Sequence, residues 1–298
     1  MKAAVGDRLL YDPEFLRKLE FLTLVARRMH RGDNRGEHAT FRKGTSLEFF
    51  DYRNYQPGDE FRYIDWNVFS RIDRLFVKLY RAEEDLSVHL LVDTSESMRF
   101  GKPSKIDYAR KVGVALGSVG ISNLDRVGVT AFADGLGECL SPHRSKRRIF
   151  SLFDYFSRIQ AKGGTSLNRS LIDYSVRCKR PGLAIVLSDL LDADGYEKGL
   201  LSLLYRRFDV VVIHIVAEEE LKPPVKGAFR LIDSETGAAM RVTVDEDIVR
   251  SYRRAVQGFF RGSEEFCLKH GVEYMRASTI IPFEDLILKY LRQGIHLK

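Results

Sequence analysis

The segment SVHLLVDTSESM, residues 87–98, decides the fold. Its first part, SVHLLVD, is apolar with little polar alternation, which is typical of a parallel strand covered by helices on both faces. Four later runs share this character: RVGVTAFAD (126–134), GLAIVLSDL (182–190), DVVVIHIVA (209–217) and GVEYMRAST (271–279). Because helical patterns lie between these runs, the sequence predicts an α/β domain with a mostly parallel, Rossmann-like sheet.

Two connecting segments show clear helical patterns. Apolar residues at three- and four-residue spacing predict the first helix: Ile106, Ala109, Val112, Leu116 and Val119. A second helix is expected from about Asp245 to His270, with Thr243 and Glu246 as a capping box and Gly271 as its stop. The segment between the fourth and fifth strands, FRLIDSETGAAMRVTVD, predicts a hairpin with its turn at residues 235–237.

The composition of the chain changes near residue 85. Before it, the sequence is dense in charged and aromatic residues, and we expect residues 1–84 to form a smaller α+β subdomain. Residues 85–298 form the predicted main domain. The subdomain's expected elements are a helix at 13–30, a strand at 46–55, a turn at 57–59, a helical segment at 60–70 and a strand at 75–80.

Composition excludes several classes of protein. The chain has 298 residues, of which 44% are hydrophobic and 30% charged, with a net charge of +7. This apolar content excludes wholesale disorder. The longest apolar run, residues 183–187, is far shorter than the roughly 20 residues of a membrane-spanning helix. The start of the chain lacks the apolar stretch of a secretory signal. We therefore expect a cytoplasmic protein with no membrane segment.

The cysteines and histidines form no recognisable metal or disulfide pattern. Cys139, Cys178 and Cys267 are too few and too far apart for a disulfide framework, and we expect buried, reduced thiols. No two histidines have the four-residue spacing of a helical metal site. His89 and His214 lie inside predicted strands, so we expect them to serve packing.

Side chains that carry oxygen follow the first strand of the main domain. Asp93, Ser95 and Ser97 alternate by two, at the end of the strand where open α/β sheets bind ligands. Thr165 in the loop GGTSL and Asp189 at the end of LAIVLSD add two more oxygen ligands. Hard cations such as Mg²⁺ prefer an all-oxygen environment. The sequence therefore predicts a divalent-cation site. Serine after a strand also caps helices, which leaves a purely structural role open.

The segments DTSES, GGTSL and VLSD, in this order, resemble the metal-ion-dependent adhesion site of von Willebrand factor A domains. The resemblance implies a three-layer α/β fold and a Mg²⁺ or Mn²⁺ ion bound directly by Ser95 and Ser97. It implies that Thr165 binds the ion directly or through water. Asp93 and Asp189 would act mostly through water. One coordination position would remain for a carboxylate from a protein partner.

A second resemblance involves the N-terminal part. The stretches EFFDYRNYQPGDEFRYIDWNVFSR (48–71) and LFVKLYRAEEDLSVHLLVDTSESM (75–98) are similar to the signature of the bacterial domain of unknown function 58 family. Many members carry membrane helices before this region, and this chain resembles the soluble branch. Genes of the family commonly neighbour those of MoxR-type AAA+ ATPases. This implies an adaptor role for such an ATPase in complex assembly or metal-centre maturation.

We therefore expect a non-catalytic, metal-dependent protein-interaction module, and enzyme functions fit less well. LLVDTSES resembles the nucleophile strand of haloacid-dehalogenase-like phosphatases, but Ser95 stands where those enzymes need a second aspartate. A metal-dependent phosphohydrolase is the least favoured alternative. The phosphate loop of nucleotide hydrolases and the G-x-S-x-G turn of serine hydrolases are both missing from the sequence.

Two basic patches leave nucleic-acid binding open as an alternative. Few aromatic residues for base stacking interleave with them, so docking of an acidic protein surface fits better. The patches are residues 27–43, with Arg27, Arg28, Arg31, Arg35, Arg42 and Lys43, and residues 144–148, with Arg144, Lys146, Arg147 and Arg148.

The charged and aromatic segment at residues 48–71 also has two interpretations. It is either a small folded unit held by its own ion pairs and a buried Trp66, or a surface specific for a partner. The sequence does not separate the two.

Overall fold

The structure is a computed structural model that describes residues 9–33, 47–82, 86–222, 227–232 and 237–292. The chain divides into two compact units. The larger contains the residues up to His30 and those from Leu86 onward, and the smaller is Arg31–Asp85. This division differs from the predicted one in the first 30 residues, because apolar side chains of the N-terminal helix, such as Phe15 and Leu22, lie in the core of the larger unit.

A six-stranded sheet forms the centre of the larger unit, and it confirms the predicted fold class. Its strands are β3 (Ser87–Asp93), β4 (Arg126–Phe132), β5 (Leu136–His143), β6 (Leu183–Ser188), β7 (Asp209–Val216) and β10 (Glu273–Ser278). Their order is β10-β7-β6-β3-β4-β5, and only the edge strand β5 is antiparallel to its neighbour. Counted from β3, this is the doubly wound order 3-2-1-4-5-6. The sequence pattern did not predict β5.

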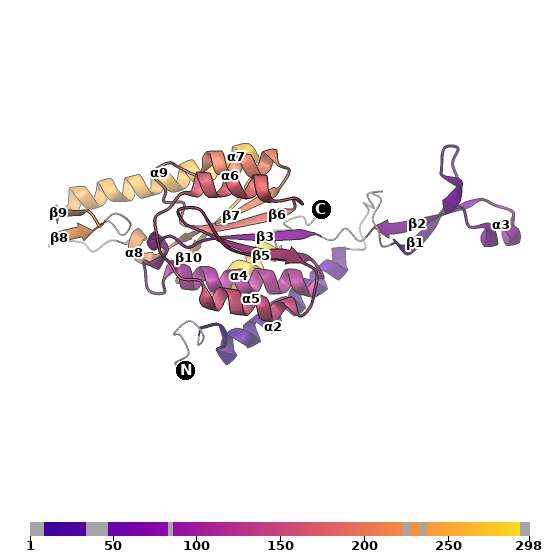
Figure 1. Cartoon of the computed structure of the whole chain (residues 1–298), viewed down its shortest axis with the longest axis horizontal. Coiled ribbons are helices and arrows are strands. Elements are labelled where there is room, and N and C mark those ends of the chain that lie inside the picture. Colours follow the sequence, from indigo (N-terminus) through magenta and orange to yellow (C-terminus); the bar gives the residue numbers. More distant parts are fainter. Residues whose placement is uncertain (1–8, 34–46, 83–85, 223–226, 233–236, 293–298) are drawn as a thin grey trace. The chain divides into compact units, whose positions relative to one another are not determined.

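Helices cover both faces of the sheet and produce three layers (Figure 1). One face carries α2 (Pro13–Asp33), α4 (Lys105–Ser122), α5 (Arg148–Arg158) and α10 (Phe283–Arg292). The other carries α6 (Leu167–Arg177), α7 (Glu197–Tyr205) and α9 (Glu246–His270). Among the described residues, none of these helices combines the length and apolar character that a bilayer crossing requires.

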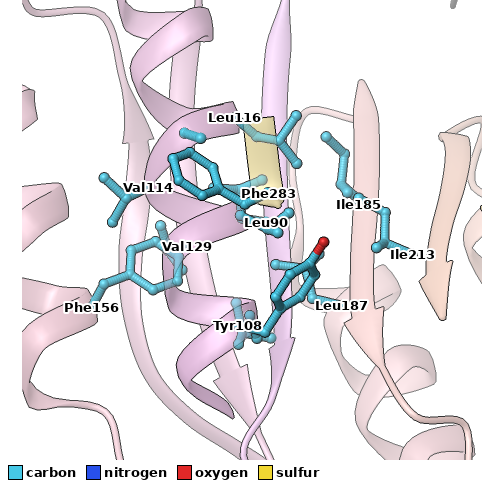
Figure 2. Packing of buried hydrophobic residues seen from close by; sticks show 14 of the residues in the cluster. Leu90, Tyr108, Val114, Leu116, Val129, Phe156, Ile185, Leu187, Ile213 and Phe283 are labelled. Atoms are coloured by element: carbon cyan, nitrogen blue, oxygen red, sulfur yellow. The ribbon is translucent and has the colours of Figure 1, made fainter. Parts of the chain in front are cut away.

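Successive strand residues enter the two apolar cores in turn. Leu90 belongs to the core beneath α4, whereas Leu91 belongs to the core beneath α6. Figure 2 shows part of the first core, where Ile185 and Ile213 of neighbouring strands lie near Leu90. Because both faces are buried, the central strands need no polar alternation. The buried His89 serves packing as expected, and its ring hydrogen-bonds the Tyr174 hydroxyl at 2.7 Å.

The α9 helix has the predicted bounds but a different N-terminal cap. Its N-cap is Asp245, whose carboxylate accepts a hydrogen bond from the Ile248 N–H at 2.8 Å. Thr243 instead lies in β9 (Ala239–Val244), which pairs with β8 (Gly227–Ile232) in an antiparallel hairpin. Most of the predicted hairpin turn lies outside the described residues. Gly271 ends α9 with a φ of 71°, as predicted.

The cysteine prediction was correct in part. All three thiols are free, but only Cys267 is buried. Cys178 is partly exposed and Cys139 is exposed, because Cys139 lies on the edge strand β5 that the sequence pattern missed.

The smaller unit consists mainly of an antiparallel pair, β1 (Leu47–Asn54) and β2 (Phe76–Ala82), with a short helix, α3 (Trp66–Ile72), between them. Asp65 caps α3 and also bonds Lys78 Nζ at 3.0 Å and the Tyr52 hydroxyl at 2.8 Å. These partners, Lys78 first, hold the pKa of Asp65 well below its ordinary value. Trp66 is 58% exposed, so the prediction of a buried indole was wrong.

Helix α4 packs closely on α5 because it carries glycines at the contact. A Cβ atom at Gly113 would overlap the ring of Phe156, and one at Gly117 would lie 2.7 Å from a methyl carbon of Leu152. Phe156 and Leu152 are both fully buried, so neither can move aside into solvent. The two glycines therefore set the distance between the helices.

We predict that Gly113→Ala destabilises the protein by about 1–3 kcal/mol, because the added methyl group overfills a packed core. The control is Gly258→Ala in α9, where a Cβ would meet no atom within 4 Å. There the better helix propensity of alanine is expected to stabilise the fold by about 0.5–1 kcal/mol. Denaturant unfolding of both variants measures the two changes, and equal effects would contradict the close α4–α5 contact.

Candidate functional site

The candidate site lies where the strand order of the sheet reverses. Asp93 ends β3, Ser188 ends the neighbouring strand β6, and Asp189 directly follows Ser188. The connections from β3 and β6 lead to opposite faces of the sheet, to α4 and α7 (Figure 1). Such a switch point opens a crevice at the carboxyl ends of the strands, where doubly wound proteins bind ligands.

The carboxylate of Asp93 is the centre of a hydrogen-bond cluster. One of its oxygens accepts bonds from the Ser95 backbone N–H at 2.9 Å and the Ser95 hydroxyl at 2.7 Å. The other accepts the Ser188 hydroxyl at 2.6 Å. The hydroxyl oxygens of Ser95 and Ser97 lie 3.0 Å apart. Three of the predicted residues are thus brought together, and Ser97 is the partly exposed one.

The loop that contains Thr165 is bound to the Asp93 loop through its backbone. The Glu96 N–H donates to the Gly163 carbonyl at 2.9 Å, and the Lys162 N–H donates to the Thr94 carbonyl at 2.7 Å. Gly163 has a φ of 82°, a conformation that glycine adopts readily. Thr165 is two positions along the chain from Gly163, whose carbonyl is bonded to the Asp93 loop.

Asp189 contacts two groups of the protein itself. One of its carboxylate oxygens accepts the Leu191 N–H at 3.0 Å, and the other lies 2.7 Å from the ammonium of Lys105. Lys105 is only 1% exposed and also bonds Glu220 at 2.5 Å. A lysine at the start of α4 thus links β6 to α8 (Glu218–Leu221).

Burial and neighbouring charge dominate the electrostatics of the site. Burial, together with the nearby Asp189 carboxylate, raises the pKa of Asp93 to about 7, although the Ser188 and Ser95 hydrogen bonds oppose this change. Burial alone would lower the pKa of Lys105, but Asp189 and Glu220 raise it above its ordinary value. The positive charge near Asp93 therefore does not offset the negative charge of the Asp93 and Asp189 carboxylates.

The residues present fit a hard divalent cation in their chemistry. Carboxylate and hydroxyl oxygens gather around Asp93, and they are the ligand type that Mg²⁺ and Mn²⁺ prefer. The described residues contain no group of three or more His, Cys, Asp or Glu side chains that could hold a metal. A cation here would thus depend on serine hydroxyls and water for much of its coordination.

Sequence reasoning missed three residues of the site. Ser188 directly precedes Asp189 in VLSD, so its place at the same strand end could have been inferred. Lys105 and Glu220 carry no such signal, because each is one charged residue in a short polar stretch. Ser104 caps α4 by accepting the Asp107 N–H at 3.2 Å.

Comparison with known proteins shows the family. The family described as "Protein of unknown function DUF58" matches residues 51–258, which is more than half of the chain, and the chain belongs to it. The sheet order and the oxygen-rich loops at the switch point agree with the predicted von Willebrand factor A-like fold.

Relatives and solved structures show more distant similarity. An uncharacterised protein of Mycobacterium bovis is 26% identical over 250 residues, or 82% of this chain and 78% of that protein. The conserved hypothetical protein BatB from Bacteroides thetaiotaomicron aligns with 70% of this chain and 99% of its own, at 15% identity and a TM-score of 0.43. The VWA domain of SpRpn10 aligns with 69% of this chain and 94% of its own, at 11% identity and a TM-score of 0.38.

We predict that Lys105→Met lowers the free energy of unfolding by about 3–5 kcal/mol, because it leaves two carboxylates without their buried cation. The control is Lys222→Met, which removes a 75% exposed lysine that follows α8 and pairs with Glu218 of that helix. That change is expected to stay within about 0.5 kcal/mol. Urea unfolding of both variants is the measurement. A similar small effect for both would show that the buried pair does not persist in solution.

Proposed function

We propose that this protein is a non-catalytic module that captures an acidic side chain of a protein partner through a bound Mg²⁺ or Mn²⁺ ion. The observation that carries this proposal is the oxygen cluster at the sheet's switch point, where the Ser95 hydroxyl lies within hydrogen-bond distance of both Asp93 and Ser97. Ser95 and Ser97 would hold the ion, and Asp93 would orient the Ser95 hydroxyl. A carboxylate of the partner would then coordinate the bound ion.

The balance of buried charge supports a divalent ion. Asp93, Asp189 and Glu220 are three carboxylates near the site, and the ammonium of Lys105 bonds Asp189 and Glu220. The remaining charge of −2, with all four groups ionised, is what a divalent cation neutralises. A buried carboxylate without such compensation is costly. The partly exposed Ser97 gives the cluster a side that a partner can approach.

Burial of the serine supports a docking role over catalysis. Ser95 is fully buried, and its hydroxyl donates to Asp93 rather than to a histidine. His214 lies on β7 opposite Ser188, but its Nδ1 bonds the Tyr274 hydroxyl at 2.7 Å. Burial lowers the pKa of His214 to about 4. The described residues near Asp93 thus provide no serine–histidine pair for acyl transfer.

The partner that we propose is a MoxR-type AAA+ ATPase, for which the chain would act as an adaptor in complex assembly or maturation. The resemblance to a family whose genes neighbour such ATPases motivates this choice. In physical terms, a partner of this kind needs an exposed acidic side chain that can reach the ion.

We predict that wild-type protein binds Mn²⁺ or Mg²⁺ saturably in a calorimetric titration. Asp93→Asn and Ser97→Ala are each expected to weaken the affinity by about tenfold or more, since they alter the ligands or their support. The control is Ser157→Ala, whose hydroxyl bonds the Asp154 carbonyl within its own helix. Unchanged metal affinity in both site variants would refute the site.

We predict that a MoxR-type AAA+ ATPase from the same genome co-purifies with the wild-type chain in Mg²⁺, and that EDTA or Asp93→Asn abolishes capture. Ser157→Ala should capture it normally. Capture that survives both EDTA and Asp93→Asn would show that docking does not use the metal. Absence of capture in Mg²⁺, with metal binding intact, would show that the partner is a different protein.

A further inference from the structure

The ends of α6 and α7 form one surface at the amino ends of β6 and β7, the edge of the sheet opposite the candidate metal site. Helix α6 leads into β6 and α7 leads into β7, and these strands are parallel neighbours. The Arg206 Nε–H donates to the Ser175 carbonyl at 3.1 Å, which joins the two helix ends. The Asp209 N–H donates to the Gly182 carbonyl at 3.0 Å, which joins the connections that follow the helices. We call this the α6–α7 surface.

Four apolar side chains are exposed on α6 and α7, which lie side by side over the same face of the sheet (Figure 1). Ile172 and Val176 are four residues apart on α6, so they lie on one side of that helix. Leu201 and Tyr205 have the same spacing on α7. The exposed fraction rises toward the helix ends, reaching 65% for Val176 and 89% for Tyr205. Exposed apolar side chains gathered in this way are typical of protein-interaction sites.

Basic residues surround the exposed ends of both helices. The segments 172–182 and 201–209 contain five basic residues and two acidic ones, Asp173 and Asp209, which gives a net charge of +3. All five basic side chains are exposed, and none forms an ion pair with another described residue. They are Arg177, Lys179, Arg180, Arg206 and Arg207.

The negative ends of the two helix dipoles offset only part of this charge. Each helix end carries about half a negative elementary charge, so the surface stays positive. Hydrogen bonds within the protein also occupy carbonyl groups of the last turns. The Tyr174 carbonyl accepts the Cys178 N–H at 2.9 Å, and the Leu203 carbonyl accepts the Phe208 N–H at 3.1 Å. An approaching anion therefore meets free guanidinium and ammonium groups.

The combination of charge and apolar side chains selects the kind of partner. A second copy docked on the same surface by a two-fold axis would bring like charges together, which is unfavourable. A nucleic acid would pair with the basic residues through its phosphates, but it would leave the aliphatic side chains without apolar contacts. An acidic helix packed across α6 and α7 would contact both pairs of apolar residues and offer carboxylates to the arginines.

We propose that the α6–α7 surface docks an acidic amphipathic helix of a protein partner. The apolar side of that helix covers Val176 and Tyr205, and its carboxylates pair with the basic residues at the helix ends. Because the α6–α7 surface and Asp93 lie at opposite edges of the sheet, this docking does not require a bound metal ion. The proposal therefore stands or fails separately from the metal-dependent capture described above.

The test measures binding of labelled, blocked peptides to the full chain by fluorescence anisotropy. EDTA is present throughout, so that no peptide carboxylate can bind through a metal ion. The first peptide is about 20 residues long, with leucines at helical spacing and glutamates at most other positions. The second replaces each glutamate by lysine, and the third is a shuffled form of the first that lacks an apolar side. We predict saturable binding of the first peptide and affinities at least about tenfold weaker for the other two.

Substitutions at exposed positions place the binding on the surface. Tyr205→Ala and Arg180→Glu are each expected to weaken binding of the first peptide by about fivefold or more. The matched controls lie on the opposite face of the sheet. They are Phe150→Ala, which removes a 76% exposed aromatic ring of α5, and Arg147→Glu, which changes the exposed residue before that helix. Both controls should bind the peptide as wild type does, and all four variants should fold because the altered side chains are exposed.

A second arm uses sedimentation with vesicles of phosphatidylserine and phosphatidylcholine, which present an anionic membrane. Vesicle binding that is lost in Tyr205→Ala would assign the surface to a membrane and overturn the proposal. Three peptide results would also overturn it: no saturable binding of the first peptide at millimolar concentration, equal binding of the shuffled or lysine peptide, or equal affinities in Tyr205→Ala and Phe150→Ala.

Discussion

The carboxylate of Asp93 is the contact on which this end of the molecule depends. It lies at the tip of β3, fully buried, and accepts three hydrogen bonds from Ser95 and Ser188. These bonds fix the turn that leaves β3 and connect it to the end of β6. The Ser188 hydroxyl in turn accepts the Leu190 N–H at 2.9 Å, where the chain turns with a φ of 58°. One acidic group thus determines the path of two loops.

A second buried acid in the same region has a lysine for its partner. The bonds from Lys105 to Asp189 and Glu220 connect the start of α4 to β6 and α8. Glu220 also accepts the Ala217 N–H at 2.8 Å, and its neighbour Glu219 accepts the Lys102 N–H at 3.0 Å. Buried ion pairs contribute little net stability compared with apolar packing, but their loss is costly. Here the pairs fix how α8 meets the loop before α4.

The sequence predicted the fold well where one physical rule decides the structure. Strands buried on both faces must be apolar throughout, and β3 has the limits that its pattern predicts. The edge strand β5 was not predicted, because its exposed residues of mixed polarity resemble a loop. Helix α2 was assigned to the wrong unit, since periodicity identifies an apolar face but not the surface that it packs on.

The candidate site was predictable to a similar degree. The doubly wound topology explains why Asp93, Ser95 and Asp189 come near one another, since strand ends at a switch point are adjacent. The partner of Asp189 was not predictable, because Lys105 is 84 positions away in the chain. Long-range ion pairs of this kind depend on how a helix is rotated over the sheet. That rotation follows from packing, which no local pattern records.

The glycines of α4 have a consequence for motion near the site. A ring of Phe156 and a methyl group of Leu152 occupy the places where side chains at Gly113 and Gly117 would lie. A one-residue screw motion of α4 past α5, which combines translation and rotation, would put Val112 or Val114 in the place of Gly113, and the added side chain would overlap Phe156. The two glycines therefore fix the register of α4 against α5. Any conformational change at the strand ends must therefore occur in the loops that follow β3 and β6. Lys105, at the start of α4, keeps its position.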